Sequence, residues 1–345
     1  MSALTVREEG AESDWTRPGV FRVADGVFRI PLPLPNDGLR AVNVYAIVDD
    51  GGLTMIDSGW ALAESQELLG RAIAALDCGF PDIRRFLVTH VHRDHYTQAI
   101  AIRQTYGNQV ALSIDERTSI DNANDRQGFR RHLNQLVRCD AGPVLEMFRK
   151  MDRPPPEPNL WEYPDEWIDG RTDIKLAERA LVAIPTPGHT RGHLIFRDDS
   201  NVLTFTGDHV LPHITPSIGF EAAPSDMPLA DYLDSLKLVR EMPDTAMLPA
   251  HGPAAASVHA RVDELLDHHD RRLGLSFEAI KSGATTAYQA AGILKWTRRE
   301  RSLVDMDPFN QMLAVLETAA HLDVLVAQRR LTSVDTDGVR HYQMA

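Results

Sequence analysis

Residues 87–100 read LVTHVHRDHYTQAI, and this stretch decides the fold. A short apolar run leads into three histidines and one aspartate within six positions, namely His90, His92, Asp94 and His95. Imidazolium charges placed side by side repel one another, so a plain solvated loop explains this crowding poorly. Imidazole nitrogens and carboxylates are the ligands that zinc and similar divalent metals prefer. The stretch therefore predicts a buried strand whose end carries metal ligands into the next helix.

Three later segments carry further candidate ligands where an apolar strand pattern ends. They are TPGHTRGH (186–193) with His189, LTFTGDHV (203–210) with Asp208, and LPAHGP (248–253) with His251. Ligands that are close neighbours in sequence cannot fully surround one ion, so distant partners are expected. Strand ends meet at one edge of an open α/β sheet, where such proteins commonly place their sites. We therefore expect these three side chains to converge on residues 90–95.

The pattern around these segments indicates an α/β (α+β) fold with a mixed sheet. Two apolar runs joined by DDGG, residues 49–52, predict a hairpin. Helical spacing predicts a helix over 61–79 that Gly79 stops, and another over 96–107 that ends at Gly107. Strand-like runs alternate with these helices. Such alternation favours a sheet with helices on its outer face.

The chain divides into a loose polar tail (1–18), a catalytic domain (19–257) and a C-terminal unit (258–345). Within the catalytic domain, residues from about 115 to 175 form a mostly helical, then proline-rich stretch between ligand motifs.

The C-terminal unit has helical periodicity near 258–282, 285–295 and 308–330, followed by a hairpin with Asp-Gly at its turn. Three helices and a hairpin resemble a winged-helix unit. Residues 261–345 hold 11 Lys plus Arg and 12 Asp plus Glu, so this unit is close to neutral. A structural or dimerising role is therefore expected for it ahead of DNA binding.

Together, THVHRDH, PGHTRGH, GDHV and AHG, with MIDSG upstream, resemble the ordered motifs of the metallo-β-lactamase fold superfamily of metallo-hydrolases. The resemblance covers about residues 20–255 and implies an αββα sandwich with a dinuclear site at one sheet edge. It implies two ligand sets and a bridge: His90, His92 and His189 for the first metal, Asp94, His95 and His251 for the second, and Asp208 between them. Asp57 would orient a histidine from beneath, and His193 is either a similar support or a surface residue.

This sequence departs from the family pattern directly after Asp94 and His95. The family has a small residue or glycines there, whereas this chain has Tyr96, Thr97 and Gln98. The Tyr96 phenol could contact a substrate oxygen or serve as a packing residue. The gap between His95 and His189 is longer than in compact members of the family, so the resemblance implies that residues from about 115 to 175 are an insertion that covers the cleft as a lid. In this expected lid, Trp161, Tyr163 and Trp167 are candidate substrate contacts.

Two divalent ions that share a carboxylate lower the pKa of a bridging water, so the resemblance predicts hydrolysis by a metal-bridging hydroxide. Asp94 would shuttle the proton as well as ligate. TMIDSGW, residues 54–60, is not a Gly-x-Ser-x-Gly nucleophile elbow, so no serine nucleophile is expected. Zinc is the expected metal, and iron or manganese could use the same ligands.

Composition narrows the substrate class. The net charge of −13 argues against a nucleic-acid or membrane partner. The acidic start of the sequence has no apolar segment of a signal peptide, and only two cysteines are present, so a cytoplasmic location is expected. A thioester, ester or lactone hydrolase that acts on a small molecule fits best, and a homodimer is the expected assembly. A nuclease or phosphodiesterase of the same fold, a β-lactamase-like amide hydrolase and a non-catalytic relative remain as alternatives.

Overall fold

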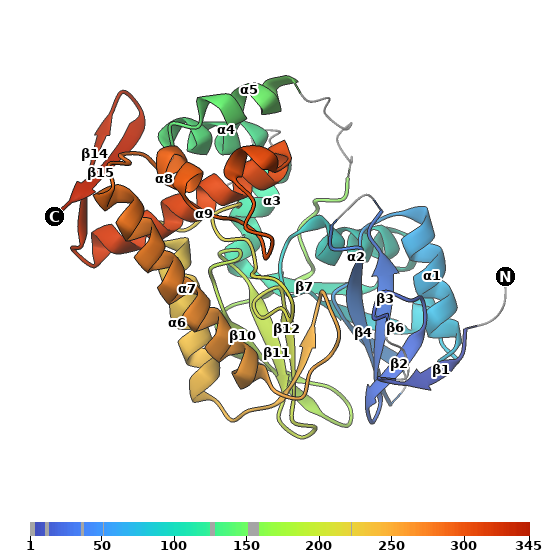
Figure 1. The fold of residues 1–345 in the computed structure, drawn as a ribbon. Coiled ribbons are helices and arrows are strands. Elements are labelled where there is room, and N and C mark those ends of the chain that lie inside the picture. Colours follow the sequence, from blue (N-terminus) through green and yellow to red (C-terminus); the bar gives the residue numbers. More distant parts are fainter. Residues whose placement is uncertain are drawn as a thin grey trace.

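The computed structural model describes residues 4–10, 14–35, 38–50, 52–124, 128–150, 159–221 and 223–345. Within these residues the strands form two large sheets and a separate hairpin (Figure 1). The first sheet has eight strands in chain order: β1 (Val6–Glu8), β2 (Val20–Ala24), β3 (Val27–Pro33), β4 (Ala41–Asp49), β5 (Gly52–Ile56), β6 (Ile83–Leu87), β7 (Gln109–Ser113) and β8 (Glu166–Ile168). The second has five, ordered β13 (Ala246–Pro249), β12 (Leu203–Gly207), β11 (Leu194–Asp198), β10 (Ala180–Pro185) and β9 (Thr172–Lys175).

The two sheets face each other across a layer of apolar side chains. In β4, Tyr45 and Ile47 belong to this layer, whereas Val44 and Ala46 belong to the core on the opposite face. Successive side chains alternate across a strand, so β4 is buried on both faces. From the second sheet, the Phe205 ring meets the Tyr45 ring edge-on with 5.2 Å between centroids.

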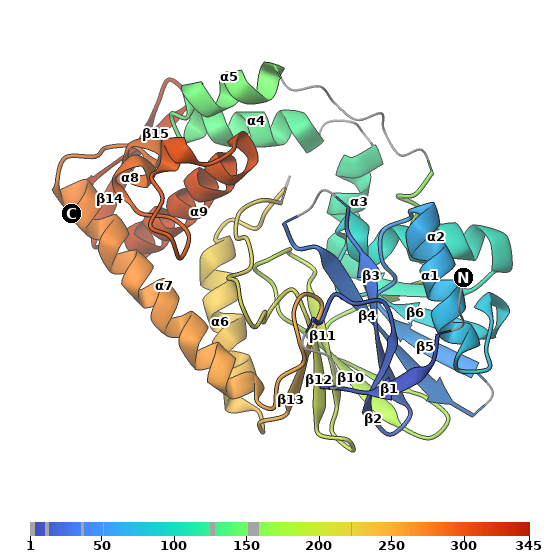
Figure 2. The same cartoon turned by 45° about the vertical axis from the view of Figure 1, so that its right-hand side comes forward.

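Helices cover the outer face of each sheet. On the first sheet, α1 (Ala63–Ala74) and α2 (Arg93–Tyr106) bury Leu69 and Ile100 against the strands. On the second sheet, α6 (Pro228–Glu241) buries Tyr232 and Leu236. Figures 1 and 2 show α1 and α2 on one side of the sheet pair and α6 on the other. The predicted αββα sandwich is confirmed.

Local signals predicted the ends of two of these elements with unequal success. The DDGG hairpin is confirmed, because Asp49 pairs with Gly52 in the β4–β5 ladder. Helix α2 ends as predicted, with Gly107 in the left-handed conformation at φ 77°. Helix α1 ends at Ala74 instead of near Gly79, because Asp77 adopts a left-handed conformation at φ 58° and a short 3₁₀ turn follows. An aspartate tolerates this conformation better than most residues, so it can end a helix without glycine.

The prediction of a loose N-terminal tail is wrong for Val6–Glu8. These residues form β1 and pair in parallel with β2. Glu9 is held next to them by an ion pair with the buried Arg29, at 2.9 Å. A three-residue strand is too short to show a periodic pattern, so the sequence does not reveal it.

The expected lid is shorter than its predicted range. Its first part forms α3 (Arg117–Asn124), α4 (Gly128–Arg138) and α5 (Gly142–Lys150), and the proline-rich residues 151–158 lie outside the described residues. Its last part, from Glu166, forms β8 and β9 and therefore belongs to the two sheets. Helices α4 and α5 bury Leu136 and Phe148 in a core that they share with the C-terminal helices (Figure 2).

The C-terminal unit consists of α7 (Val258–Lys281), α8 (Ala287–Ile293), α9 (Pro308–Ala327) and a hairpin of β14 (Leu331–Thr336) and β15 (Val339–Met344). The predicted helices and the Asp-Gly turn are confirmed, whereas the winged-helix identity stays a prediction. The core does not break at residue 257, because Tyr232 of α6 and Leu316 of α9 belong to one continuous apolar cluster. The C-terminal unit therefore packs on the catalytic domain through a shared core.

Candidate metal centre

Every predicted metal ligand follows a strand, and the strand directions bring them to one edge. His90 follows β6, His189 follows β10, Asp208 follows β12 and His251 follows β13. Strand β11 is antiparallel to both β10 and β12, and β12 is parallel to β13. The carboxyl ends of β10, β12 and β13 therefore point the same way. Parallel β5 and β6 do the same in the first sheet.

Two glycines let the ligand turns approach their neighbours closely. At Gly188, with φ 135°, a Cβ atom would lie 2.4 Å from Cβ of Tyr232. At Gly207, with φ 50°, it would lie 2.7 Å from Nε2 of His193. No other residue fits either position without moving a buried ring, so the glycine before each ligand is a packing requirement.

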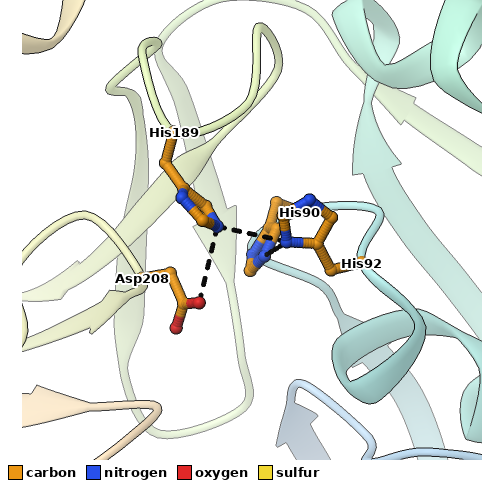
Figure 3. Close-up of side chains that lie close together, drawn as sticks. All are labelled: His90, His92, His189 and Asp208. Atoms are coloured by element: carbon orange, nitrogen blue, oxygen red, sulfur yellow. Dashed lines mark hydrogen bonds and ion pairs between the residues drawn. The ribbon is translucent and has the colours of Figure 1, made fainter. Parts of the chain in front are cut away.

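His90, His92 and His189 direct ring nitrogens at one point (Figure 3). His92 Nδ1 lies 3.0 Å from His90 Nε2 and 3.1 Å from His189 Nε2. A neutral ring nitrogen carries either one proton or one lone pair, so hydrogen bonds cannot satisfy all three atoms. Tetrahedral zinc with Zn–N distances of about 2.0–2.1 Å would separate its nitrogen ligands by roughly 3.3 Å. The spacing therefore fits a metal ion better than a hydrogen-bonded cluster.

Asp94, His95 and His251 form a second group beside the first. The Asp94 carboxylate lies 3.6 Å from His95 Nε2 and 3.5 Å from His251 Nε2. Asp208 faces both groups, with Oδ2 3.4 Å from His189 Nε2. Its Oδ1 lies 3.4 Å from His251 Nε2 and 3.8 Å from His95 Nε2. The structure thus brings all seven predicted ligands together.

Buried atoms in this second group have no hydrogen-bond partner, which tests whether a cation fits. His95 Nε2, His251 Nε2 and Asp208 Oδ1 are all buried and unpaired among the described residues. An unpaired buried polar atom is costly, and three that face one another need a shared partner. Two imidazole nitrogens and a carboxylate oxygen are a donor set suited to a divalent metal.

In His95, His189 and His251, the ring nitrogen that points away from the cluster has a fixed hydrogen-bond partner. His189 Nδ1 donates to the Ser217 carbonyl at 2.9 Å, and His251 Nδ1 donates to the Ala41 carbonyl at 2.7 Å. A carbonyl only accepts, so both rings turn an Nε2 lone pair toward the cluster. His95 Nδ1 lies 2.9 Å from Asp57 Oδ2. Such outer partners orient metal-binding histidines in many proteins.

Asp57 and His193 lie beneath the ligands, where the sequence analysis expected a supporting role. Asp57 accepts hydrogen bonds from the backbone N–H and the hydroxyl of Thr89, the residue before His90. His193 is fully buried, and its Nε2 accepts the backbone N–H of Asp208 at 3.1 Å. The surface alternative for His193 is therefore wrong.

The electrostatics of the two groups differ. Burial, and then the neighbouring His189, lowers the pKa of His92 to about 3, so this ring is neutral and can ligate. For His95, burial alone would lower the pKa, but the carboxylates of Asp94, Asp57 and Asp208 raise it to about 10. The carboxylates therefore favour a positive charge at or beside His95. A proton on the ring supplies this charge when no metal is bound.

Glu116 is a supporting residue that the sequence did not reveal. It is fully buried, and its Oε1 accepts the Thr190 hydroxyl and the Val91 backbone N–H, the latter at 3.4 Å. Val91 lies between two ligands and Thr190 follows His189, so one carboxylate connects both ligand loops. Burial and the nearby Glu221 raise the pKa of Glu116 well above its usual range. No sequence signal distinguishes it from an acidic helix-start residue.

The four expected substrate contacts meet at the segment of residues 161–167. Tyr96 is fully buried, and its hydroxyl donates to the Glu162 carbonyl at 2.6 Å. Trp161 and Tyr163 line a separate hollow of about 330 Å³ together with Asn124, Asn159 and Glu162. The Tyr163 ring also meets the Trp167 ring, 5.6 Å away. Tyr96 therefore ties α2 to the segment that carries these aromatics.

A different aromatic group lies next to the ligands. The Phe220 ring is 6.3 Å from the His92 ring and 5.0 Å from the stacked His132 ring of α4. Phe309, in the first turn of α9, meets Phe220 edge-on at 5.4 Å and leaves 42% of its surface exposed. The sequence could not connect these residues, because they come from three distant segments.

Comparisons with known proteins agree with this geometry. The profile of the "Metallo-beta-lactamase superfamily" matches residues 37–251. The chain is 26% identical to "Probable metallo-hydrolase YqjP" of Bacillus subtilis, over 88% of this chain and 93% of that one. It is 34% identical to "Lactamase-like protein nscB" of Aspergillus fumigatus, over 68% of this chain and 55% of that one.

Among solved structures, a "Beta-lactamase domain protein" from Burkholderia ambifaria matches with a TM-score of 0.75 and 26% identity, over 96% of both chains. This match extends through the C-terminal helices, so the association of the two parts is not peculiar to this chain. Within the described residues no helix is long and apolar enough to cross a membrane. Fold, ligand geometry and family match agree: the chain belongs to the metallo-beta-lactamase superfamily and is a metal-dependent hydrolase.

Proposed function

We propose that this protein is a dinuclear hydrolase that cleaves a thioester, ester or lactone bond in a small molecule. The observation that carries the dinuclear part is the position of Asp208. One oxygen faces His189 and the other faces His95 and His251, at 3.4–3.8 Å. A carboxylate that reaches two ligand groups can offset the repulsion between two cations. Zinc is the proposed metal, with iron or manganese as alternatives for the same ligands.

The protein side chains have separate tasks in this proposal. His90, His92 and His189 present neutral nitrogens, and Asp57 orients the His95 ring. When bound, divalent metals supply a hydroxide nucleophile near neutral pH and polarise a carbonyl oxygen. Asp94 is the most accessible ligand carboxylate, with 15% of its side chain exposed against 8% for Asp208. It is therefore best placed to accept a proton from water and pass it to the leaving group.

An acyl substrate is supported by the aromatic group beside the ligands. The Phe220 ring lies 6.3 Å from the His92 ring, and Phe309, which contacts Phe220, leaves 42% of its surface exposed. An apolar acyl or aromatic group gains free energy by covering such rings. We propose these residues, together with His132, as the wall that holds the substrate's apolar part.

The alternatives would need other surroundings. A nuclease needs cations along a channel, whereas this chain carries a net charge of −13. A β-lactamase-like amide hydrolase would use the same ligands, so the choice rests on substrate testing. We propose that the substrate is a small molecule and that the protein binds neither nucleic acid nor a membrane.

The experiment combines metal analysis with a hydrolysis screen of zinc-loaded protein. Acyl-thioesters, lactones, aryl esters, a β-lactam and bis-p-nitrophenyl phosphate serve as substrates. The proposal expects two metal equivalents at the centre and the highest kcat/KM for a thioester, ester or lactone. Preference for the phosphodiester would replace it with the phosphodiesterase alternative. Asp208→Ala, tested in parallel, shows whether the measured activity belongs to this centre.

A further inference from the structure

A second group of possible ligands lies in the C-terminal unit. His268 and His269 on α7 and Glu317 on α9 place ligand atoms within 4.8 Å of one another. Helices α7 and α9 pack against each other as they approach α6 (Figure 2). Tyr232 lies between this group and the residue that follows Asp208, because its ring is 5.4 Å from the His269 ring and 5.1 Å from that of His209.

A chain of hydrogen bonds decides which nitrogen of His269 carries the proton. His321 Nδ1 lies 2.7 Å from the Glu317 carbonyl oxygen, which can only accept, so His321 Nδ1 is the donor. His321 Nε2 lies 3.1 Å from His269 Nδ1. The His321 ring is fully buried, and burial favours the neutral imidazole, so its Nε2 is an acceptor. His269 Nδ1 must therefore donate to it.

This tautomer leaves a lone pair on His269 Nε2. That atom is buried in a fully buried residue and has no hydrogen-bond partner among the described residues. One His269 nitrogen lies within 4.8 Å of ligand atoms of His268 and Glu317, and Nε2 is the nitrogen that the bond to His321 leaves free. A histidine whose Nδ1–H is held by a fixed acceptor and whose other nitrogen is free has the arrangement of a metal ligand. A buried acceptor without a donor also calls for an occupant.

The charges around the group set how tightly a cation can bind. Burial raises the pKa of the Glu317 carboxyl, and Arg272 opposes this shift. The Arg272 guanidinium itself is turned toward the Lys295 carbonyl, at 3.1 Å, and lies 4.2 Å over the Trp296 ring. Burial, and then Arg272, Arg271 and Arg261, lower the pKa of His268 to about 4, so His268 is also neutral. One carboxylate near three arginines predicts a weaker site than the three aspartates of the metal centre.

We propose that His268, His269 and Glu317 form a separate binding site for a zinc-class divalent cation, which ties α7 to α9. Two neutral imidazoles and a carboxylate leave a fourth position for water, as zinc sites with three protein ligands do. The ion would lie in the shared core between the catalytic domain and the C-terminal unit. Because its ligands come from two packed helices of the shared core, the ion would hold α7 and α9 together.

The test counts zinc equivalents in the full-length protein. Metal-free protein is titrated with zinc against a chromophoric chelator, and wild type is compared with His269→Ala and Glu317→Gln. Each variant is expected to bind one equivalent less than wild type and to keep the activity of the zinc-loaded enzyme. Zinc in excess should also raise the melting temperature of wild type more than that of either variant. His259→Ala, on the same helix, is the matched control and should bind as much zinc as wild type.

The comparison does not depend on the number of ions at the catalytic centre, because it measures a difference between variants. Equal zinc equivalents in wild type, His269→Ala and Glu317→Gln would overturn the proposal and leave a buried histidine pair solvated by water. Glu317→Gln keeps the size of the side chain, and circular dichroism of each variant checks folding. If His269→Ala does not fold, Glu317→Gln decides the outcome alone.

Discussion

Two regions of this protein crowd buried imidazoles, and their surroundings differ in charge. At the metal centre, Asp57, Asp94 and Asp208 face the histidines, and they raise the pKa of His95 to about 10 despite its burial. In the α7–α9 group of His268, His269 and Glu317, a single carboxylate lies near histidines whose pKa values burial lowers, that of His268 to about 4. Burial alone lowers the pKa of a histidine and keeps it neutral, whereas buried carboxylates beside it favour a positive charge at the site. The centre is therefore built to hold metal strongly, and the α7–α9 group weakly.

The two regions also differ in how they depend on the rest of the chain. The centre is assembled from strand ends in both sheets, and its geometry survives only if both sheets form. The C-terminal unit has no separate core, because Tyr232 and Leu316 share one cluster. This difference predicts that the C-terminal unit supports the whole protein even though it supplies none of the seven ligands.

Truncation after residue 256 is the change with the largest expected effect. It would expose the face of α6 that carries Tyr232 and Leu236, and buried apolar side chains are worth about 1.5–3 kcal/mol each. We expect aggregated protein on size-exclusion chromatography. A soluble, active truncated form that has lost salt-sensitive DNA binding in a gel-shift assay would instead favour a nucleic-acid role for the C-terminal unit.

Asp208→Ala should be next in size. Loss of outer partners of metal ligands typically costs about 10–100-fold, so loss of a carboxylate that faces both groups should cost more than about 100-fold in kcat/KM. Elemental analysis should show fewer bound ions than in wild type. Asp234→Ala, which removes an exposed carboxylate from α6, is the control and should change neither value. Near-normal turnover with the full metal content in Asp208→Ala would remove Asp208 from the centre.

Phe309→Ala tests whether the C-terminal unit reaches the substrate. Part of the Phe309 ring is available for contact, so its loss should raise KM for apolar acyl substrates about fivefold, with kcat and metal content unchanged. Val304→Ala removes an exposed side chain from the same unit and should have no effect. If Tyr163→Ala raises KM and Phe309→Ala does not, the substrate lies toward the hollow of Trp161 and Tyr163 instead.

Glu116→Gln has the smallest expected effect, which is a change in how the melting temperature depends on pH. The raised pKa of Glu116 means that the folded state keeps this proton after the unfolded state, with an ordinary value of about 4.3, has lost it. Its contribution to stability is therefore complete below that ordinary value and is lost as pH rises through the raised one. The melting temperature of wild type should fall by a few degrees more than that of Glu116→Gln between about pH 5 and pH 9. Parallel melting curves for the two proteins would contradict this.

The sequence alone predicted the fold class and the residues at the centre. A metal ligand must be one of a few residue types, and ligands at strand ends follow apolar runs that are visible in sequence, as in LVTHVHRDH. The glycines at 107 and 338 and the DDGG turn were likewise readable, because left-handed backbone conformations restrict the residue type. These features are local, so no knowledge of the packing was needed.

The tertiary structure alone decided what surrounds the ligands. His132, Phe220 and Phe309 come from α4, a loop and α9, and each looks like an ordinary residue until packing brings the rings together. The same holds for Glu116, and for His269 and His321, whose bond joins two helices. Contacts between distant segments depend on how whole helices and strands pack together. They produce no periodic residue pattern within either segment. Metal coordination restricts the residue type, so ligands can be recognised in the sequence. Shape complementarity accepts many residue types, so packing partners are known only from the folded protein.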